Sequence, residues 1–186
     1  MQMAFYFDQS RCVGCYTCSV ACKDWNDINI GPIHWRRVTS KEWGTYPTVF
    51  LTYLSLSCNH CAKPACIKVC PAQAITKREG DGIVVVTREK CLGKKLCETL
   101  CQKACPYHVP QFGEEDHATM QMCTFCLERI EQHKKPICVE ACPMRALDAG
   151  PLDELKAKYG EVQEAEGFIY SKKTKPSIIL KPRYSK

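Results

Sequence analysis

The sequence predicts an α+β fold with little regular secondary structure, built as two similar halves around cysteine loops. Three observations lead to this prediction. The 186 residues include 16 cysteines, which fall into four groups of four with none left over. Every group ends in the same Cys-x3-Cys spacing, which indicates an internal duplication. Short apolar runs of strand length precede or separate the groups.

The spacing within the groups is typical of iron–sulfur ligands. The groups are Cys12-x2-Cys15-x2-Cys18-x3-Cys22, Cys58-x2-Cys61-x4-Cys66-x3-Cys70, Cys91-x5-Cys97-x3-Cys101-x3-Cys105 and Cys123-x2-Cys126-x11-Cys138-x3-Cys142. Bacterial ferredoxins bind [4Fe–4S] clusters through C-x2-C-x2-C-x3-C-P, whose spacing the first group matches and whose proline ends the other three. The fourth cysteine of each such run binds the other cluster, so we expect the groups to work in crossed pairs. Four groups predict four [4Fe–4S] clusters.

Two other chemistries use many cysteines. Disulfide scaffolds reach this cysteine content, but repeated C-x2-C spacing is more typical of metal binding. A non-redox zinc module would use paired C-x2-C knuckles, yet zinc does not explain the recurring Cys-Pro endings. Sixteen cysteines match sixteen iron atoms. We therefore expect His60 and His108, in or beside cysteine loops, to pack or form hydrogen bonds and not to bind iron.

The formal charge of +6 does not predict a nucleic-acid partner. An oxidised [4Fe–4S] core with its four thiolates carries about −2, so four clusters bring the total to about −2. Between Cys61 and Cys105, nine Lys or Arg residues accompany four Asp or Glu. Positive charge beside a cluster favours its reduced form, although a solvated surface is the simpler account for most of these lysines.

No apolar stretch is long enough to span a bilayer, and the longest, residues 49–54, is strand-sized. Residues 1–8 show neither a basic region followed by an apolar core nor a twin-arginine signal. We expect a chain made in the cytoplasm that has no transmembrane segment of its own and reaches a membrane only as a peripheral part of a complex. Export with a signal-bearing partner stays open.

Apolar patterns predict the regular elements in turn. Residues 4–7 and 49–56 predict strands that lead into the first and second groups. Residues 74–86 predict a β-hairpin, because two apolar runs flank a Gly-Asp-Gly turn. Residues 151–160 predict a helix that starts at proline and stops at glycine. Residues 175–182 predict an extended segment that lies on a partner subunit or packs as an edge strand.

Residues 23–48 contain all three tryptophans and no cysteine. We interpret this stretch as an inserted loop that covers the clusters or contacts a partner. Ordinary aromatic packing is expected to bury at least two of Trp25, Trp35 and Trp43.

Several motifs resemble those of one protein family. They are Cys58-Asn59-His60-Cys61 with Pro64 and Cys66, Cys105-Pro106-Tyr107, Cys123-Thr124-Phe125-Cys126, Lys-Pro-Ile-Cys-Val-Glu-Ala-Cys-Pro-Met-Arg-Ala-Leu at 135–147 and Thr-Lys-Pro-Ser-Ile at 174–178. Through them nearly the whole chain resembles the four-cluster electron-transfer (beta or B) subunits of the dimethyl sulfoxide reductase superfamily of anaerobic respiration. The resemblance implies a duplicated bacterial-ferredoxin-like fold. It also implies a non-catalytic subunit that relays electrons between a catalytic subunit carrying a molybdenum or tungsten pterin and a membrane anchor, quinone or soluble partner.

The family pairs the first group with the fourth and the second with the third. Carried over, this pairing implies four ligand sets, which we name the first to fourth quartets. They are Cys12, Cys15, Cys18 and Cys142; Cys22, Cys123, Cys126 and Cys138; Cys58, Cys61, Cys66 and Cys105; and Cys70, Cys91, Cys97 and Cys101. The third group departs from the family pattern because its spacing is stretched to x5 and x3. A [3Fe–4S] cluster at the fourth quartet therefore stays an alternative.

The same pairing predicts the domain organisation. Residues 1–57 with 106–150 would form one ferredoxin-like half that carries the 23–48 insert, and residues 58–105 would form the other. Residues 151–186 would be a tail that packs on the body or on a partner. A free-standing polyferredoxin is the alternative function, although a diffusible carrier needs neither insert nor tail. The sequence contains no nucleotide-binding glycine fingerprint and no nucleophile–base constellation.

Overall fold

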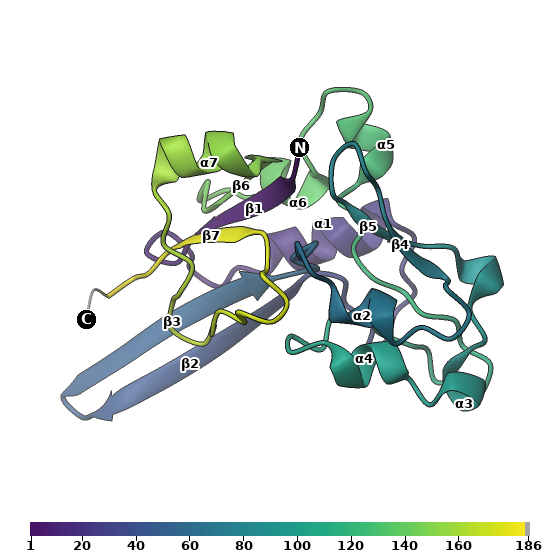
Figure 1. Cartoon of the computed structure of the whole chain (residues 1–186). Coiled ribbons are helices and arrows are strands. Elements are labelled where there is room, and N and C mark those ends of the chain that lie inside the picture. Colours follow the sequence, from purple (N-terminus) through teal and green to yellow (C-terminus); the bar gives the residue numbers. More distant parts are fainter. Residues whose placement is uncertain (185–186) are drawn as a thin grey trace.

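The computed structural model describes residues 1–184, and its regular elements are short, as predicted (Figure 1). The elements are β1 (Met3–Asp8), α1 (Thr17–Trp25), β2 (Arg37–Thr45), β3 (Thr48–Leu56), α2 (Ala65–Lys68), β4 (Ile75–Lys77), β5 (Val84–Val86), a 3-10 turn (Arg88–Lys90), α3 (Lys94–Cys97), α4 (Leu100–Ala104), α5 (Leu127–Ile130), α6 (Ile137–Glu140), β6 (Leu147–Pro151), α7 (Leu152–Tyr159) and β7 (Ile178–Lys181). Long connections between them carry the cysteines.

The two ends of the chain close one sheet, in the order β6-β1-β7. Strand β1 runs antiparallel to β6 and parallel to β7, with Phe5 opposite both Ala149 and Ile178. All six residues of β1 are buried. The strand predicted at 4–7 is thus confirmed, and the segment 175–182 contains an edge strand whose Ile179 is fully buried.

Helix α7 covers this sheet. Pro151 precedes it and Gly160 ends it with φ +86°, as the proline–glycine pattern predicted. Its Leu155 joins Tyr6 and Ile179 in a small apolar cluster. Sheet and helix together fix the N-terminal strand directly before the first cysteine loop.

The segment 23–48 is not simply a loop. Its second part is β2, which pairs with β3 from Arg37 opposite Leu56 to Thr45 opposite Thr48. The resulting two-stranded ribbon projects from the body (Figure 1). The strand predicted at 49–56 is confirmed as β3, but no pattern had indicated its partner.

The expectation of two buried tryptophans is wrong, because only Trp35 is buried, at 6% exposure. Trp25 is 44% exposed, and the Arg129 guanidinium lies 4.6 Å from the centre of its ring. Trp43 is half-buried on the ribbon and stacks on Phe50, the residue opposite it, with ring centres 5.8 Å apart. The ring of Tyr184 packs edge-on against both, at 5.6 Å from Trp43 and 5.2 Å from Phe50, so Trp43 is covered by a few side chains of the ribbon and the C-terminal segment and not by the core.

The main core lies between the β6-β1-β7 sheet and the predicted hairpin, which forms as β4 and β5. Phe5 from the sheet meets Phe125 from a cysteine loop, with ring centres 4.4 Å apart. Ile83 and Val84 complete this core from the hairpin. Cysteines of all four groups belong to the same apolar cluster, so each cysteine group is partly packed into the body.

Candidate metal centres

The Cys-x3-Cys endings place two cysteines on one face of a short helical segment, four residues apart. Helix α1 carries Cys18 and Cys22, and the segment that starts with α6 carries Cys138 and Cys142. These two segments pack against each other, and Cys18 of one lines the same hollow as Cys142 of the other. Each segment thus contributes one cysteine to the first quartet and one to the second.

The second and third groups repeat this arrangement. Helix α2 carries Cys66 and ends two residues before Cys70, and α4 carries Cys101 and ends one residue before Cys105. These helices also pack against each other. Cysteines from segments far apart in the sequence are therefore brought together in two similar crossings.

The loops around the crossings also repeat. The third residue after each Cys-Pro cysteine has a left-handed backbone: Gln73, His108 and Arg145 have φ angles of 50°, 48° and 50°. After this turn, the N–H groups of Ala74 and Ala146 donate to the sulfurs of Cys70 and Cys142, both at 3.3 Å. N–H···S hydrogen bonds of this kind help to set the reduction potential of a cluster.

The loops that begin with Cys58-x2-Cys61 and Cys123-x2-Cys126 also have the same local structure. His60 and Phe125 have positive φ, and their N–H groups donate to the sulfurs of Cys58 and Cys123, both at 3.4 Å. The side chain of His60 is buried, and its Nδ1 accepts a hydrogen bond from the N–H of Val84 at 3.0 Å. His60 thus forms a hydrogen bond in its loop, as the sequence suggested.

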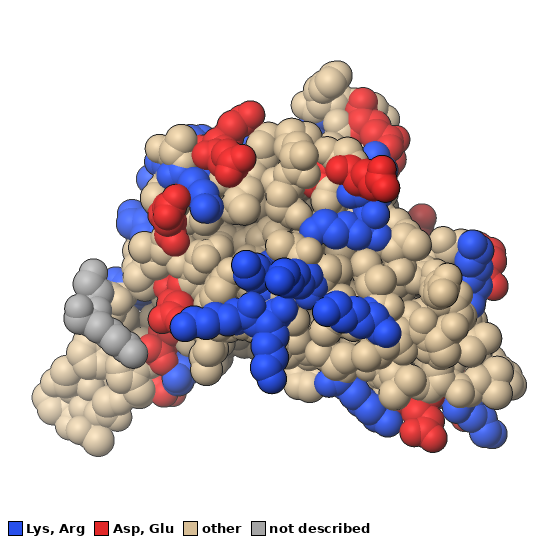
Figure 2. Space-filling view, viewed as in Figure 1, with Lys and Arg blue, Asp and Glu red and all other residues tan. Residues whose placement is uncertain are grey.

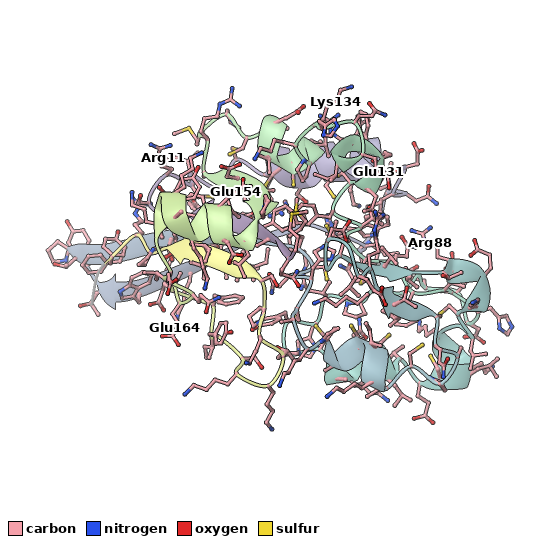
Figure 3. The ribbon with its side chains drawn as sticks, turned by 45° about the horizontal axis from the view of Figure 1, so that its top comes forward. Arg11, Arg88, Glu131, Lys134, Glu154 and Glu164 are labelled. Carbon is pink, nitrogen blue, oxygen red and sulfur yellow. The ribbon has the colours of Figure 1, made fainter. Side chains whose placement is uncertain are left out.

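Three of the quartets surround hollows. The first, third and fourth quartets line hollows with about 340, 380 and 340 Å³ of empty space, part of it open to solvent. The other lining side chains are mainly apolar, such as Phe7 and Leu147 around the first quartet. Figure 3 shows sulfur atoms in the interior, whereas labelled charged residues such as Arg11 and Lys134 point outward.

The second quartet is packed more tightly. Cys22, Cys123, Cys126 and Cys138 are each 6% exposed or less. Burial raises the pKa of Cys22 strongly, and the neighbouring thiolates of Cys123, Cys138 and Cys126 raise it further. The thiols of this quartet are therefore electrostatic neighbours, which is compatible with one shared cluster.

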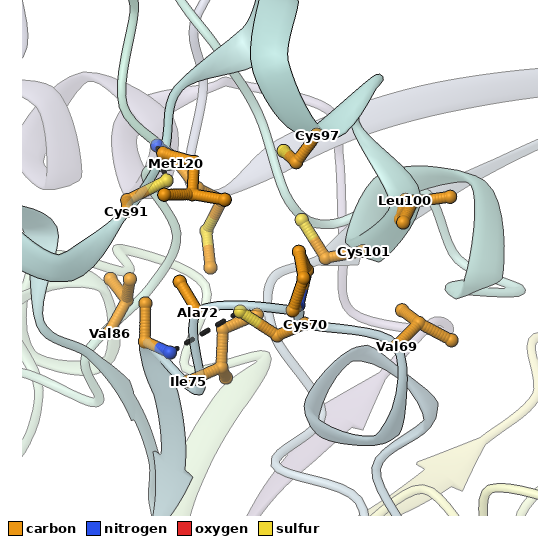
Figure 4. A pocket seen from close by; sticks show the side chains of 13 residues that line it. Val69, Cys70, Ala72, Ile75, Val86, Cys91, Cys97, Leu100, Cys101 and Met120 are labelled. Carbon is orange, nitrogen blue, oxygen red and sulfur yellow. Dashed lines mark hydrogen bonds between the residues drawn. The ribbon is translucent and has the colours of Figure 1, made fainter.

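The stretched third group still brings four cysteines together at the fourth quartet (Figure 4). The extra residues form α3, and Glu98 and Thr99 then reverse the chain with positive φ before α4. Cys97 at the end of α3 and Cys101 on α4 consequently face the same hollow as Cys70 and Cys91. The insertion lengthens the loop without removing a thiol from the hollow.

The first quartet depends on a close approach. Gly14, between Cys12 and Cys15, has φ +70°, and a Cβ there would overlap the ring of Tyr53. Cys15 is exposed, and hydrogen bonding from Thr17 lowers its pKa, whereas burial raises the pKa of Cys12. The first quartet is thus the one that reaches the surface through an exposed ligand.

The donor set suits iron–sulfur clusters. Burial, with a smaller contribution from nearby thiolates, raises the pKa of Cys66, Cys101 and Cys126 to about 12 and that of Cys61 to about 11. Thiols packed in this way ionise only when a metal replaces their protons. No three His, Cys, Asp or Glu side chains within residues 1–184 converge closely enough to hold one metal ion. The cysteines of the first, third and fourth quartets instead surround spaces, which is what a cubane cluster requires.

Two unpaired donors add to this fit. Asn59 Nδ2 and Thr174 Oγ1 are buried without a hydrogen-bond partner among the described residues, and both residues line the hollow of the third quartet, called the third hollow below. Buried donors nearly always have an acceptor. The thiolate and sulfide atoms of a bound cluster are acceptors.

Arg36 is a functional candidate that the sequence analysis missed. It is 2% exposed, and its guanidinium donates to Ser55 and to the hydroxyl of Ser57. Although burial alone would lower the pKa of Arg36, the thiolates of Cys138, Cys18 and other cysteines raise it above its usual value. One signal in the sequence could have indicated that Arg36 is buried. It lies two residues before the apolar Val38, and alternate residues of an extended strand point to the same face.

Crossed quartets, all-thiol donor sets and repeated Cys-Pro turns define an iron–sulfur electron-transfer protein. Residues 49–152 match the family model described as a 4Fe-4S dicluster domain. Over 97% of the sequence and 89% of the relative, the protein is 44% identical to the B subunit of the anaerobic dimethyl sulfoxide reductase of Escherichia coli.

More distant relatives have the same role in other reductases and dehydrogenases. The B subunit of the sulfite dehydrogenase of Allochromatium vinosum is 33% identical over 98% of the sequence and 83% of the relative. The iron–sulfur subunit of the arsenate respiratory reductase of a Shewanella species is 30% identical, with 87% of each covered. The protein belongs to the family of iron–sulfur B subunits of the dimethyl sulfoxide reductase superfamily, which transfer electrons and are not catalytic themselves. Within residues 1–184, no helix has the length and apolar character to cross a membrane.

Proposed function

We propose that each quartet binds one [4Fe–4S] cluster and that the four clusters form a relay for single electrons. One end of the relay receives or delivers electrons at a catalytic subunit with a molybdenum or tungsten pterin. The other end exchanges them with a membrane anchor or a soluble redox partner. The complex would be cytoplasmic or peripheral to a membrane.

The observation that carries the proposal is the pair of crossed helical segments. In each crossing, cysteines four residues apart serve two different quartets, so neighbouring clusters share the same two segments. Such sharing keeps successive clusters close, as a relay requires. The repeated turns at Gln73 and Arg145 support the further proposal of two ferredoxin-like halves, residues 1–57 with 106–150 and residues 58–105.

The fourth quartet is proposed to hold four irons and not three. Cys91 and Cys97 flank the stretched spacing, and both line the hollow of the fourth quartet with Cys70 and Cys101. A three-iron cluster would leave one of these thiols without a metal. Anaerobic purification followed by EPR of the oxidised protein distinguishes the two, because an oxidised three-iron cluster gives a signal and an oxidised [4Fe–4S]²⁺ cluster does not.

The ligand sets are tested with single cysteine variants in the complex purified without oxygen. Cys12→Ser and Cys142→Ser should remove or alter the same EPR signal of the reduced protein, although 130 positions separate them. Cys105→Ser is the matched control and should affect a different signal. Loss of two different signals in Cys12→Ser and Cys142→Ser would refute the pairing of the first group with the fourth.

The names of the relatives differ in substrate: dimethyl sulfoxide, sulfite and arsenate. We infer that the substrate is a property of the catalytic partner and not of this protein. Copurification of a pterin-containing subunit with the tagged protein tests the assignment. If the protein is isolated alone with all its iron, the alternative of a free-standing polyferredoxin is favoured.

A further inference from the structure

Four exposed lysines lie around the loop that carries the third quartet. They form what we call the lysine patch: Lys63, Lys172, Lys173 and Lys175. Two backbone hydrogen bonds join the segments that carry them, from the N–H of Ala62 to Lys175 O at 2.8 Å and from that of Lys63 to Thr174 O at 2.9 Å. Lys63 lies between Cys61 and Cys66, and Thr174 lines the third hollow. The patch is therefore built directly over that site.

The charge of the lysine patch is not balanced locally. Within the described part of the chain, none of its four lysines forms an ion pair with Asp or Glu. Figure 2 shows Lys and Arg gathered at the middle of this face, over the segment that leads into β7 and beside α2. A negatively charged cluster below the patch would interact with these lysines, but their ammonium groups lie in solvent and can also bind an anionic group of another molecule.

A concave surface adjoins the lysine patch. This side hollow has about 980 Å³ of empty space, part of it open to solvent, and lies between the β2–β3 ribbon, the loop after Cys105 and residues 167–171. Tyr107 and Phe168 stack at 4.9 Å between ring centres, and the guanidinium of Arg37 donates to Tyr107 O at 2.7 Å. Ile169 is 81% exposed at this surface. The side hollow thus combines apolar side chains with a basic rim.

The side hollow shares a wall with the third hollow. Pro106 and Tyr107 line both of them. A group seated in the side hollow is separated from the third quartet by these two residues and the Cys105 ligand before them. A docked partner would therefore cover the side of the protein on which the third quartet lies.

We propose that the lysine patch and the side hollow together form a docking surface for an acidic segment of a redox partner protein, which inserts an apolar side chain into the hollow. The proposal rests on the proposed function, because the occupant is a partner of the relay. A concave, partly apolar surface suits a protein segment better than a flat anionic bilayer.

The first test is zero-length carbodiimide crosslinking of the native complex, because this reagent joins lysine amines to carboxylates in contact. Lys172 and Lys173 are expected to be joined to Asp or Glu of another subunit, and to be protected from an amine-acetylating reagent. Lys134, which is exposed elsewhere, is the internal control and should stay reactive. Full acetylation of the patch lysines in the intact complex, with no crosslink, would overturn the proposal.

The second test uses charge reversal. Lys172→Glu with Lys173→Glu should slow electron transfer through the complex at low ionic strength by about tenfold or more, and salt should reduce the difference. The control, Lys134→Glu with Arg183→Glu, makes the same change in net charge at exposed sites and should have little effect. Equal slowing in both variants would contradict a specific surface.

Cluster content separates this proposal from the proposed function. If iron analysis and EPR show that the third quartet holds no cluster, the proposed function fails. If the cluster is present and the patch lysines are protected only by vesicles of anionic phospholipid, the surface faces a membrane and the protein-docking proposal is wrong.

Discussion

Replacement of Arg36 by glutamine is expected to lower the reduction potentials of the clusters at the first and second quartets. A buried cation stabilises the extra electron of a reduced cluster. Among the described residues, Arg36 has no carboxylate partner, and its charge acts on Cys18 of the first quartet and on Cys138 of the second. Removal of the charge should therefore make both clusters harder to reduce.

The structure gives the size of the effect. A hydrogen bond of 3.2 Å joins the Arg36 guanidinium to Ser55 Oγ, which lies 3.3 Å from Cys18 Sγ. The cation is thus within about 6.5 Å of the sulfur, which corresponds to about 2.5 kcal/mol at an effective dielectric constant of about 20. That energy equals about 110 mV for one electron. The electron is spread over the whole cluster, so we expect shifts of about 50 to 100 mV.

The assay is a redox titration monitored by EPR on the anaerobically purified complex. Arg36→Lys keeps the charge and should restore most of the potential, whereas Arg37→Gln removes an equal charge from the adjacent residue, whose guanidinium is directed to Tyr107 O. Iron analysis shows whether each variant retains its clusters. If Arg36→Gln keeps its iron and both potentials stay within about 20 mV of wild type, the electrostatic argument is wrong.

Three further changes have defined outcomes. Ile179→Ala leaves a cavity in the sheet core and should lower the thermal unfolding midpoint by about 5 to 12 °C, whereas the exposed Ile169→Ala should change it by less than about 2 °C. Although burial alone would raise the pKa of Asp148, hydrogen bonds from lysines and a tyrosine lower it to about 2. The ionised Asp148 therefore stabilises the fold fully above about pH 4, and this contribution is lost as the pH falls toward the folded-state pKa. The decrease in the free energy of unfolding in urea caused by Asp148→Asn should then be equal at pH 6 and pH 8, and a decrease that differs between the two pH values contradicts this. Gly14→Ala should cost about four iron atoms per chain, and Gly80→Ala, where a Cβ meets nothing within 4 Å, should cost none.

Apolar runs and turn residues in the sequence correctly predicted the short strands and the helix that such local features determine. The strands at 4–7 and 49–56, the hairpin and the proline-to-glycine helix lie where their residues indicated, because turn residues and apolar runs act over a few positions. The Cys-x3-Cys endings likewise fix two thiols on one side of a helical turn. Which of the resulting segments cross depends on packing between parts of the chain that are distant in sequence, as α1 and α6 are. The ferredoxin rule predicted crossed pairs, but only the family resemblance suggested which groups pair.

The segment 23–48 shows what such patterns miss. Residues 37–45 contain glycine, lysine and glutamate as well as valine and threonine, so they lack the alternation that indicates a strand. They form β2 because β3 beside them offers nine residues of backbone to pair with. Trp43 is consequently placed by cross-strand pairing with Phe50 and not by burial in the core.

Arg36 and Arg37 are adjacent residues of the same type, yet their side chains lie in different surroundings. Arg36 points inward with Val38, and Arg37 points to the loop after Cys105. A charge that lies between two clusters must shift both potentials in the same direction, whereas damage to one cysteine loop shifts one of them. The decisive result is therefore the pattern of the shifts. Arg36→Gln should lower two potentials together and leave that of the fourth quartet, whose hollow Arg36 does not line, at its wild-type value.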